Sequence, residues 1–225
     1  IPEIVLHQIS ARAHQIVRSQ YECLTQDILP ELAKKNLVYV KPSDFNSTQA
    51  DFAQRFFRDQ VVPLLTPLRT DSDVFPHIVN LAKYAAFLLK PISGIRQANE
   101  EFKGSEELPR IALVQIPSGI EQIVWLPSEN GKKQFALTDE IITQYGTQLF
   151  PGFAVTETLL FKVARDADFA VDEDSGHNFI HEMEKVLVQR QSSFPVKITC
   201  NDSSEFILKF LTDKLALSEE DVYKV

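Results

Sequence analysis

Hydrophobic positions near the N-terminus recur at the spacing of an α-helix. Across Ile4–Leu29, apolar residues fall mostly three, four or seven positions apart, and polar residues fill the opposite face. This pattern predicts one amphipathic helix whose apolar face needs a partner, either in the rest of the chain or in helices outside it. Pro30 is expected to end or kink the helix, with one more turn over Glu31–Lys35, because proline is accepted at a helix start.

Short apolar runs between turn residues predict the next elements. Leu37–Val40 indicates a strand or an extended link, and Asn46 or Ser47 can cap a helix over Thr48–Gln60. Val61–Leu68 carries two prolines within an apolar run. Such a run disfavours a regular helix, so we predict a buried extended segment there.

From residue 84 onward the chain is rich in strand-like runs. Three runs are each closed by a proline, and the tight connection around Gly119 predicts that the second and third form a hairpin. Thr138 is expected to cap a helix, and the long strand after it places Val155, Leu159, Phe161 and Val163 on one face. In chain order these elements are strands Tyr84–Lys90, Arg110–Ile116, Gln122–Leu126 and Gln134–Leu137, helix Asp139–Phe150 and strand Ala154–Val163.

Two helices and one strand complete the pattern. Helices are expected over Ser175–Gln191 and Ser203–Leu217, with strand Val196–Cys200 between them, and Ser218–Val225 is expected to begin a connection to a further segment. This order predicts an α+β fold, in which a helical N-terminal arm precedes a mixed, largely antiparallel sheet packed with helices. The last helix should bury one apolar stripe, consisting of Phe206, Ile207, Phe210, Leu211 and Leu215.

Composition narrows the class of protein. The 225 residues carry a formal net charge of −8, which does not suit a chain that coats nucleic acid by bulk charge, so we expect no nucleic-acid partner. No apolar run approaches the ~20 residues that cross a bilayer, and no signal-peptide pattern is present. We therefore expect a cytoplasmic protein without a membrane span. Because the sequence begins at Ile1, we expect a processed chain or an excised piece.

Two cysteines, Cys23 and Cys200, cannot supply a disulfide framework or a four-ligand zinc site. They can pair with each other in principle, but free thiols in a reducing compartment are the favoured interpretation. His177 and His181 lie four positions apart on a predicted helix, with Glu184 following. This spacing can hold a metal ion, and a metal-hydrolase function would rest on it alone. The H-E-x-x-H order is absent, so an ordinary polar helix start is favoured.

The remaining charged residues offer weaker signals. The acidic run from Asp166 to Asp174 does not fit an EF-hand, because the glycine and the final glutamate fall at the wrong positions, and we interpret it as a solvated connection. Arg165 could clamp a phosphate through its planar guanidinium or pair with Asp166 or Asp168, and the ion pair is favoured. Glycine-rich phosphate loops and the G-x-S-x-G motif are absent. Surface or structural roles are the default for three further histidines: His7, His14 and His77.

Several segments, taken in order, resemble one known family. They are L-P-E-L-A at 29–33, F-F-R-D-Q-V-V-P-L-L-T-P-L at 56–68, F-P at 75–76, N-L at 80–81, V-Q-I-P at 114–117, W-L-P at 125–127, L-F-P-G at 149–152 and F-K-V-A-R-D-A-D at 161–168. Together they resemble the ATP-dependent polyphosphate kinases that act through a phosphohistidine. The resemblance implies that residues 1–35 are the end of a helical N-terminal domain and that residues 36–225 are the head, or middle, domain.

The reaction of that family is the reversible transfer of the terminal phosphate of ATP to inorganic polyphosphate. It needs a nucleophilic imidazole, Mg²⁺ and a basic channel. The resemblance implies that the phosphorylated histidine and the magnesium ligands belong to C-terminal domains without a counterpart here. We therefore expect this chain alone to be inactive and to hold no cofactor, while it helps to form the channel wall and the interface of a homo-oligomer.

Lys162 and Arg165 are the residues that we expect at the polyphosphate channel. Ala164 stands where members of the family commonly have threonine, which makes a catalytic role for Arg165 less favoured. The alternative function is a non-enzymatic binding or assembly module that shares the head-domain fold.

Overall fold

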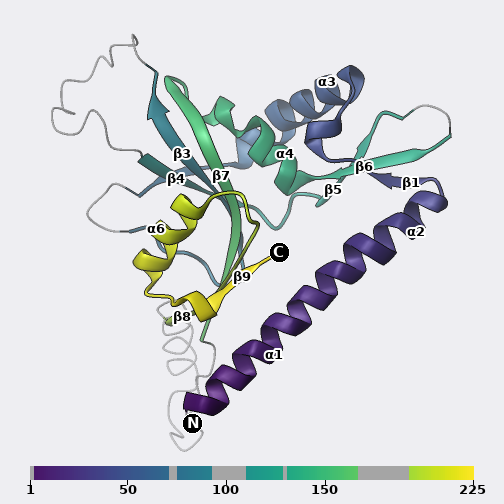
Figure 1. The fold of residues 1–225 in the computed structure, drawn as a ribbon. Coiled ribbons are helices and arrows are strands. Elements are labelled where there is room, and N and C mark those ends of the chain that lie inside the picture. Colours follow the sequence, from purple (N-terminus) through teal and green to yellow (C-terminus); the bar gives the residue numbers. More distant parts are fainter. Residues whose placement is uncertain (1–2, 71–74, 93–109, 129–130, 167–192) are drawn as a thin grey trace, which may run out of the picture.

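The computed structural model describes residues 3–70, 75–92, 110–128, 131–166 and 193–225. A long N-terminal helix leads to a small sheet, and a larger twisted sheet with helices on both faces forms the rest of the molecule (Figure 1). This arrangement confirms the α+β class. The described helices are α1 (Glu3–Glu22), α2 (Leu29–Lys34), α3 (Ser47–Phe56), α4 (Thr138–Tyr145) and α6 (Glu205–Leu215). The described strands are β1 (Leu37–Tyr39), β2 (Pro67–Arg69), β3 (Lys83–Pro91), β4 (Arg110–Ile116), β5 (Ile123–Leu126), β6 (Lys133–Leu137), β7 (Phe153–Arg165), β8 (Pro195–Cys200) and β9 (Val222–Lys224).

The N-terminal helix continues through Pro30. Between α1 and α2 lies a π-helical turn over Cys23–Ile28, in which the amide of Leu29 donates to the carbonyl of Leu24, five residues back. Proline lacks an amide hydrogen, and in a regular helix its ring meets the carbonyl four residues earlier. A wider turn at this point relieves that conflict. Of the two outcomes expected at Pro30, an end of the helix does not occur, whereas the further turn predicted over Glu31–Lys35 is confirmed, since α2 runs on to Lys34.

The larger sheet has the strand order β2-β4-β3-β7-β8-β9, and only β8 and β9 run parallel in it. The small sheet has the order β1-β6-β5, with β1 parallel to β6. The predicted hairpin between β4 and β5 is wrong, since the two strands belong to different sheets. Their burial differs accordingly: β4 is buried on both faces, whereas β5 alternates between exposed and buried residues.

A bulge in β7 divides its apolar side chains between the two faces of the larger sheet. The pairing with β3 shifts between Leu88 and Leu89, so Thr156 is an extra residue in β7. Leu159 consequently joins the cluster under α6, while Val155 packs against the cluster under α3 and α4. The single apolar face predicted for this strand is therefore wrong for Val155.

Two apolar clusters lie on opposite faces of the larger sheet. The first packs beneath α3 and α4 and includes Phe57, Phe87 and Ile141, and the second packs beneath α6 and includes Leu88 and Leu211. Phe87 and Leu88 are adjacent in β3 and point to opposite clusters, because neighbouring side chains of a strand alternate in direction. Burial on both faces explains why this strand is a continuous apolar run.

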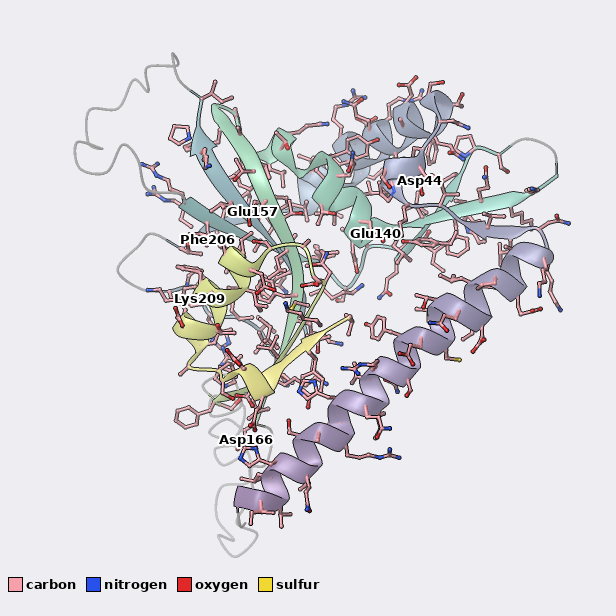
Figure 2. All side chains as sticks on the ribbon, viewed as in Figure 1. Asp44, Glu140, Glu157, Asp166, Phe206 and Lys209 are labelled. Atoms are coloured by element: carbon pink, nitrogen blue, oxygen red, sulfur yellow. The ribbon has the colours of Figure 1, made fainter. Side chains whose placement is uncertain are left out.

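The last helix is rotated slightly from the predicted stripe. The hydroxyl of Ser204 accepts a hydrogen bond from the amide of Ile207 at 3.1 Å and caps α6. Phe206 points away from the sheet and is 50% exposed, so its predicted burial is wrong (Figure 2). The buried residues follow one helical face instead: Ile207, Leu208, Leu211 and Leu215.

Three further predictions need correction. In Val61–Leu68, a short 3₁₀ turn precedes β2, and Leu64 is exposed, so this segment is buried only in part. Thr138 does not cap α4, because its hydroxyl donates to the carbonyl of Glu121. Ser218–Val225 is not only a connection, since it contains the edge strand β9 with the buried ring of Tyr223.

The helix predicted over residues 175–191 lies outside the described residues. Among the helices that the structure does describe, none is both long and apolar enough to cross a membrane.

Candidate functional site

Lys162 lies on the face of the larger sheet that is turned away from α6. Its neighbours in β7, Phe161 and Val163, are buried in the cluster under α6, so the lysine side chain leaves from the opposite face. Lys162 pairs with Lys83 of β3 on one side and with Thr199 of β8 on the other. Directly paired residues point to the same face, so these three side chains form one row across the strands.

The two lysines of this row have different surroundings. The Nζ atom of Lys83 lies 2.5 Å from Oδ2 of Asp139, and this ion pair offsets the repulsion between the paired lysines. Lys162 is exposed, and it forms no ion pair or hydrogen bond with any residue in the described ranges. Within the described part of the chain, no carboxylate therefore competes with an external anion for its ammonium group.

Lys197 is a third lysine on the same face. It pairs with Ala164, the second residue after Lys162 in β7, so the two lysines are diagonal neighbours. Burial and the charge of Lys162 lower the pKa of Lys197. Its Nζ atom lies 3.8 Å from the centroid of the ring of Tyr223, which places the ammonium group over the aromatic face.

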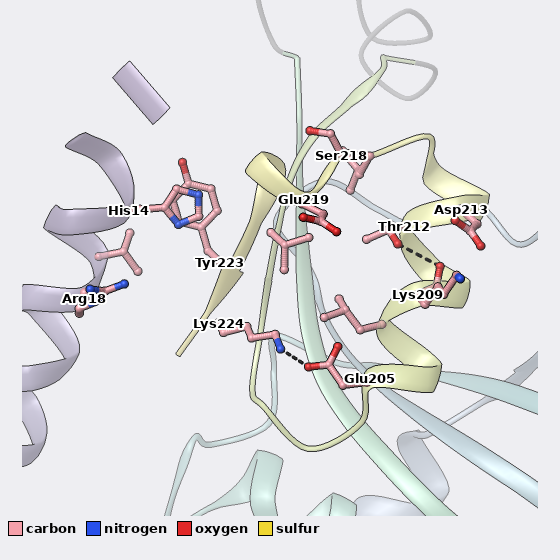
Figure 3. Close-up of a pocket in the computed structure, with 14 residues that line it drawn as sticks. His14, Arg18, Glu205, Lys209, Thr212, Asp213, Ser218, Glu219, Tyr223 and Lys224 are labelled. Atoms are coloured by element: carbon pink, nitrogen blue, oxygen red, sulfur yellow. Dashed lines mark hydrogen bonds and ion pairs between the residues drawn. The ribbon is translucent and has the colours of Figure 1, made fainter. Parts of the chain in front are cut away.

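The other face of the Tyr223 ring is covered by His14 of α1. The two rings are parallel, with an interplanar angle of 4° and 3.9 Å between their centroids (Figure 3). At these distances His14 and Lys197 cannot share one face, so the tyrosine ring lies between them. No motif in the sequence marks Lys197 or Tyr223. The alternation of β8, in which Ile198 and Cys200 are buried, is the signal that could have placed Lys197 on the face of Lys162.

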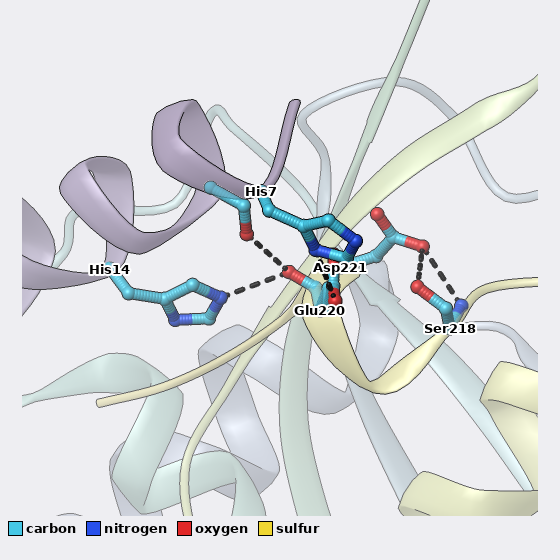
Figure 4. Close-up of polar contacts among 6 residues, drawn as sticks. His7, His14, Ser218, Glu220 and Asp221 are labelled. Carbon is cyan, nitrogen blue, oxygen red and sulfur yellow. Dashed lines mark hydrogen bonds and ion pairs between the residues drawn. The ribbon is translucent and has the colours of Figure 1, made fainter. Parts of the chain in front are cut away.

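Glu220 joins α1 to the end of the described chain (Figure 4). Its carbonyl oxygen accepts a hydrogen bond from Oγ of Ser10 at 3.3 Å and lies 2.9 Å from Nε2 of His14. Its carboxylate lies 2.8 Å from Nδ1 of His7. His7 and His14 therefore both have partners that are more than 200 positions away, and sequence spacing could not have identified them.

A groove with a volume of about 780 Å³ lies beside this contact, between α1, α6 and β9 (Figure 3). The Nζ atom of Lys224 in its wall contacts Glu205 and lies 3.0 Å from Oδ1 of Asp202. Because acidic and basic side chains are mixed here, the groove is less suited to an anion than the face of Lys162 and Lys197. Its charged lining residues are Arg18, Lys209, Lys224, Glu205, Asp213 and Glu219.

Arg165 connects three segments. Its Nε donates to the carbonyl of Ile78 at 2.8 Å, its Nη1 donates to the carbonyl of Ser193 at 2.6 Å, and its backbone amide donates to Oδ1 of Asn80 at 2.9 Å. Burial lowers the pKa of the guanidinium. These contacts fix the loop before β3 and the start of β8 to the end of β7. The predicted pairing with Asp168 concerns a residue outside the described ranges.

A part-buried polar pair links the small sheet to α4. The hydroxyl of Tyr39 donates to Oε1 of Glu140, while Oε2 of Glu140 is buried without a hydrogen-bond partner among the described residues. Burial is the largest cause that raises the pKa of both groups, and the carboxylate adds to the shift of the tyrosine. A protonated carboxyl group at this position would remove the cost of a buried charge.

No three histidine, cysteine, aspartate or glutamate side chains converge as a metal site within the part of the chain that the structure describes. The candidate metal residues His177, His181 and Glu184 lie outside it.

Three comparisons relate this chain to known proteins. A family model described as the polyphosphate kinase middle domain matches residues 48–225. The polyphosphate kinase of Halalkalibacterium halodurans is 30% identical over 227 residues, which cover all of this chain and 31% of that protein. The polyphosphate kinase of Bacillus cereus is 29% identical over 225 residues, with 99% of this chain and 31% of that protein covered.

A solved structure has the same fold. The crystal structure of polyphosphate kinase from Porphyromonas gingivalis aligns with a TM-score of 0.70 at 20% identity, and the match covers 98% of this chain and 31% of that one. At this identity the likeness shows the fold alone. The chain spans about a third of the length of these relatives.

Proposed function

Because this chain belongs to the polyphosphate kinase middle-domain family, we propose that it is the middle part of an enzyme that reversibly transfers the terminal phosphate of ATP to inorganic polyphosphate. The observation that carries the proposal is that the family match and the curated relatives together cover the chain from end to end. We assign residues 36–225 to the head domain and residues 1–35 to the end of a preceding helical domain. The proposed enzyme is a cytoplasmic homodimer with ATP and polyphosphate as substrates.

The chemistry of the reaction explains a division of labour, in which the catalytic groups and the polyphosphate contacts belong to different parts of the enzyme. Transfer between two polyanions depends on positioning and on cations that neutralise the phosphate oxygens, and it proceeds here through a nucleophilic histidine. The phosphorylated histidine and the Mg²⁺ ligands are proposed to lie outside this chain. The described residues do not fit a metal site, so no step is assigned to an ion held by them.

Within this division, the chain supplies part of the wall along which polyphosphate passes. Lys162 is the favoured contact, because its ammonium group is exposed and has no partner in the described ranges. Arg165 is proposed to shape the edge of the channel, since its guanidinium is held by the carbonyl groups of Ile78 and Ser193.

The proposal is tested with the protein as its gene encodes it. Purified protein, incubated with ATP and Mg²⁺, is expected to form a phosphate polymer that a polyphosphatase degrades. The 225-residue chain alone is expected to form none, and robust synthesis by this chain would contradict the division of labour. A gene product that binds polyphosphate without forming it would contradict the enzymatic proposal and support the binding module.

A further inference from the structure

We propose that Lys162 and Lys197 form a subsite that holds neighbouring phosphoryl groups of a linear inorganic polyphosphate. The inference rests on the proposed function and adds to it a second lysine and a fixed geometry. The two side chains leave the same face of the larger sheet, one from β7 and one from β8.

The spacing of the two lysines follows from the strand pairing. Lys162 pairs with Thr199, and Lys197 lies two positions before Thr199 in β8. Diagonal neighbours of this kind have backbones about 7–8 Å apart, which is within reach of long side chains. Because lysine side chains are long, their ammonium groups can contact phosphoryl groups of one polyphosphate chain from these two positions. The side chain of Thr199, directly opposite Lys162, leaves from the same face.

Two of the three lysines on this face lack a carboxylate partner within the described ranges. Neither Lys162 nor Lys197 has a carboxylate partner among the described residues, whereas Lys83 in the same row is paired with Asp139. The charge of Lys162 also acts on Lys197 and, together with burial, disfavours its charged form. An anion placed between the two lysines would relieve this repulsion. The feature stands out because the chain as a whole carries a net charge of −8.

Lys197 is held in place before any ligand arrives. Its Nζ atom lies over one face of the ring of Tyr223, and His14 covers the other face. Tyr223 is itself 7% exposed, so the ring is a rigid support. A lysine whose side chain is already ordered loses less conformational entropy on binding than a free surface lysine does.

The contacts of His14 and Lys197 with the Tyr223 ring also bear on which class of ligand binds here. Proteins that bind single-stranded nucleic acid add aromatic faces on which the bases stack. Here both faces of the Tyr223 ring are occupied, so this ring offers nothing to a base. A ligand that consists only of phosphoryl groups uses the lysines fully, and we therefore commit to inorganic polyphosphate.

The test measures binding of fluorescently labelled polyphosphate to the protein as its gene encodes it, by anisotropy at several salt concentrations. Lys162→Ala and Lys197→Ala are each expected to weaken binding about tenfold, the effect of losing one charge-assisted hydrogen bond. Each is also expected to reduce the slope of log affinity against log salt by about one. Lys133→Ala is the matched control, because it removes the same charge from an exposed position in the small sheet.

Two further measurements keep the outcome clear. Thermal unfolding tests whether each variant is folded. Lys197→Arg keeps the positive charge and is expected to retain most of the affinity that Lys197→Ala loses. Binding in the double variant that equals binding in Lys133→Ala would overturn the subsite, even if ATP-dependent synthesis were intact and the proposed function stood. Displacement of the label by ATP as effectively as by unlabelled polyphosphate of equal phosphate content would also count against it, because it would indicate a nucleotide site.

Discussion

The imidazole of His14 lies parallel to the ring of Tyr223, with 3.9 Å between the ring centroids. One residue belongs to the N-terminal helix and the other to the last described strand. Together with the contacts of His7 and Ser10 to Glu220, this stack fastens the start of α1 to the edge of the larger sheet. The attachment of the helix therefore depends on a few side chains and can be tested by single substitutions.

Replacement of His14 by alanine is expected to loosen α1. The variant loses the ring stack and the contact to the carbonyl of Glu220, which together are worth roughly 1–2 kcal/mol. Relative to the parent protein, hydrogen exchange should become faster in α1 and stay unchanged in α6. His14→Phe keeps a stacked ring, so exchange in its α1 should be faster than in the parent and slower than in His14→Ala. Unchanged exchange in His14→Ala would show that the stack does not hold the helix.

A methyl group at Gly146 is expected to destabilise the fold. A Cβ atom built there overlaps the ring of Phe87, which is fully buried in the first cluster. Overpacking of this kind costs about 1–3 kcal/mol, measured as the free energy of unfolding in urea. Gly119→Ala is the control, since a Cβ atom at that glycine meets no atom within 4 Å. Equal stability of the two variants would show that the ring can move aside.

The Tyr39–Glu140 pair is expected to make stability depend on pH. Burial raises the pKa of Glu140 in the folded protein above the ordinary value of 4.5. The favourable contribution of its protonated form is therefore complete below about pH 4.5 and is lost as the pH rises through the folded pKa. As the pH rises through the folded pKa, the free energy of unfolding in urea should fall in the parent chain relative to Glu140→Gln. A constant difference between the two proteins would contradict the shift.

Tyr39→Phe tests the same pair from its other side. The variant removes the donor to Oε1 and leaves a buried carboxylate without it, at a cost of about 1–3 kcal/mol. The double variant Tyr39→Phe, Glu140→Leu should recover part of this loss, because it also removes the buried acceptor. Equal losses in the single and double variants would show that the unpaired carboxylate does not cause the loss.

The two thiols are expected to react at different rates. Burial raises the pKa of Cys200 to about 11, whereas Cys23 is exposed on the helix. The thiolate is the reactive form, so a thiol-specific disulfide reagent at pH 8 should modify one cysteine of the 225-residue chain quickly. The second should react only after denaturation. Two fast equivalents would place Cys200 in contact with solvent.

The sequence carries enough information to predict most elements, because their signals are local. Apolar spacing and proline positions predict the ends of two strands to within one residue. The observed strands are β4 at Arg110–Ile116 and β8 at Pro195–Cys200. The partners of each strand depend on contacts between distant segments. Nothing near Gly119 reveals that β5 pairs with β6, and nothing near residue 88 reveals the bulge at Thr156.

The candidate site shows the same limit. A family resemblance points to Lys162, which is exposed, but its neighbour Lys197 is 35 positions away and comes close only through strand pairing. For Arg165 the sequence leaves a phosphate clamp and an ion pair as alternatives. Its described guanidinium contacts are to backbone carbonyl groups, which carry no mark in the sequence.

The π-helical turn before Pro30 has a mechanical consequence. Because it lets α1 continue into α2, residues 3–34 form one rod of roughly 48 Å, at about 1.5 Å per residue. The rod meets the small sheet at Asn36, which has a positive φ of 63°. A tilt of about 6° there would displace the first turn by roughly 5 Å, given that length. The direction of the N-terminal helix is thus fixed far from Asn36, where His7 and His14 contact Glu220 and Tyr223 beside and in β9.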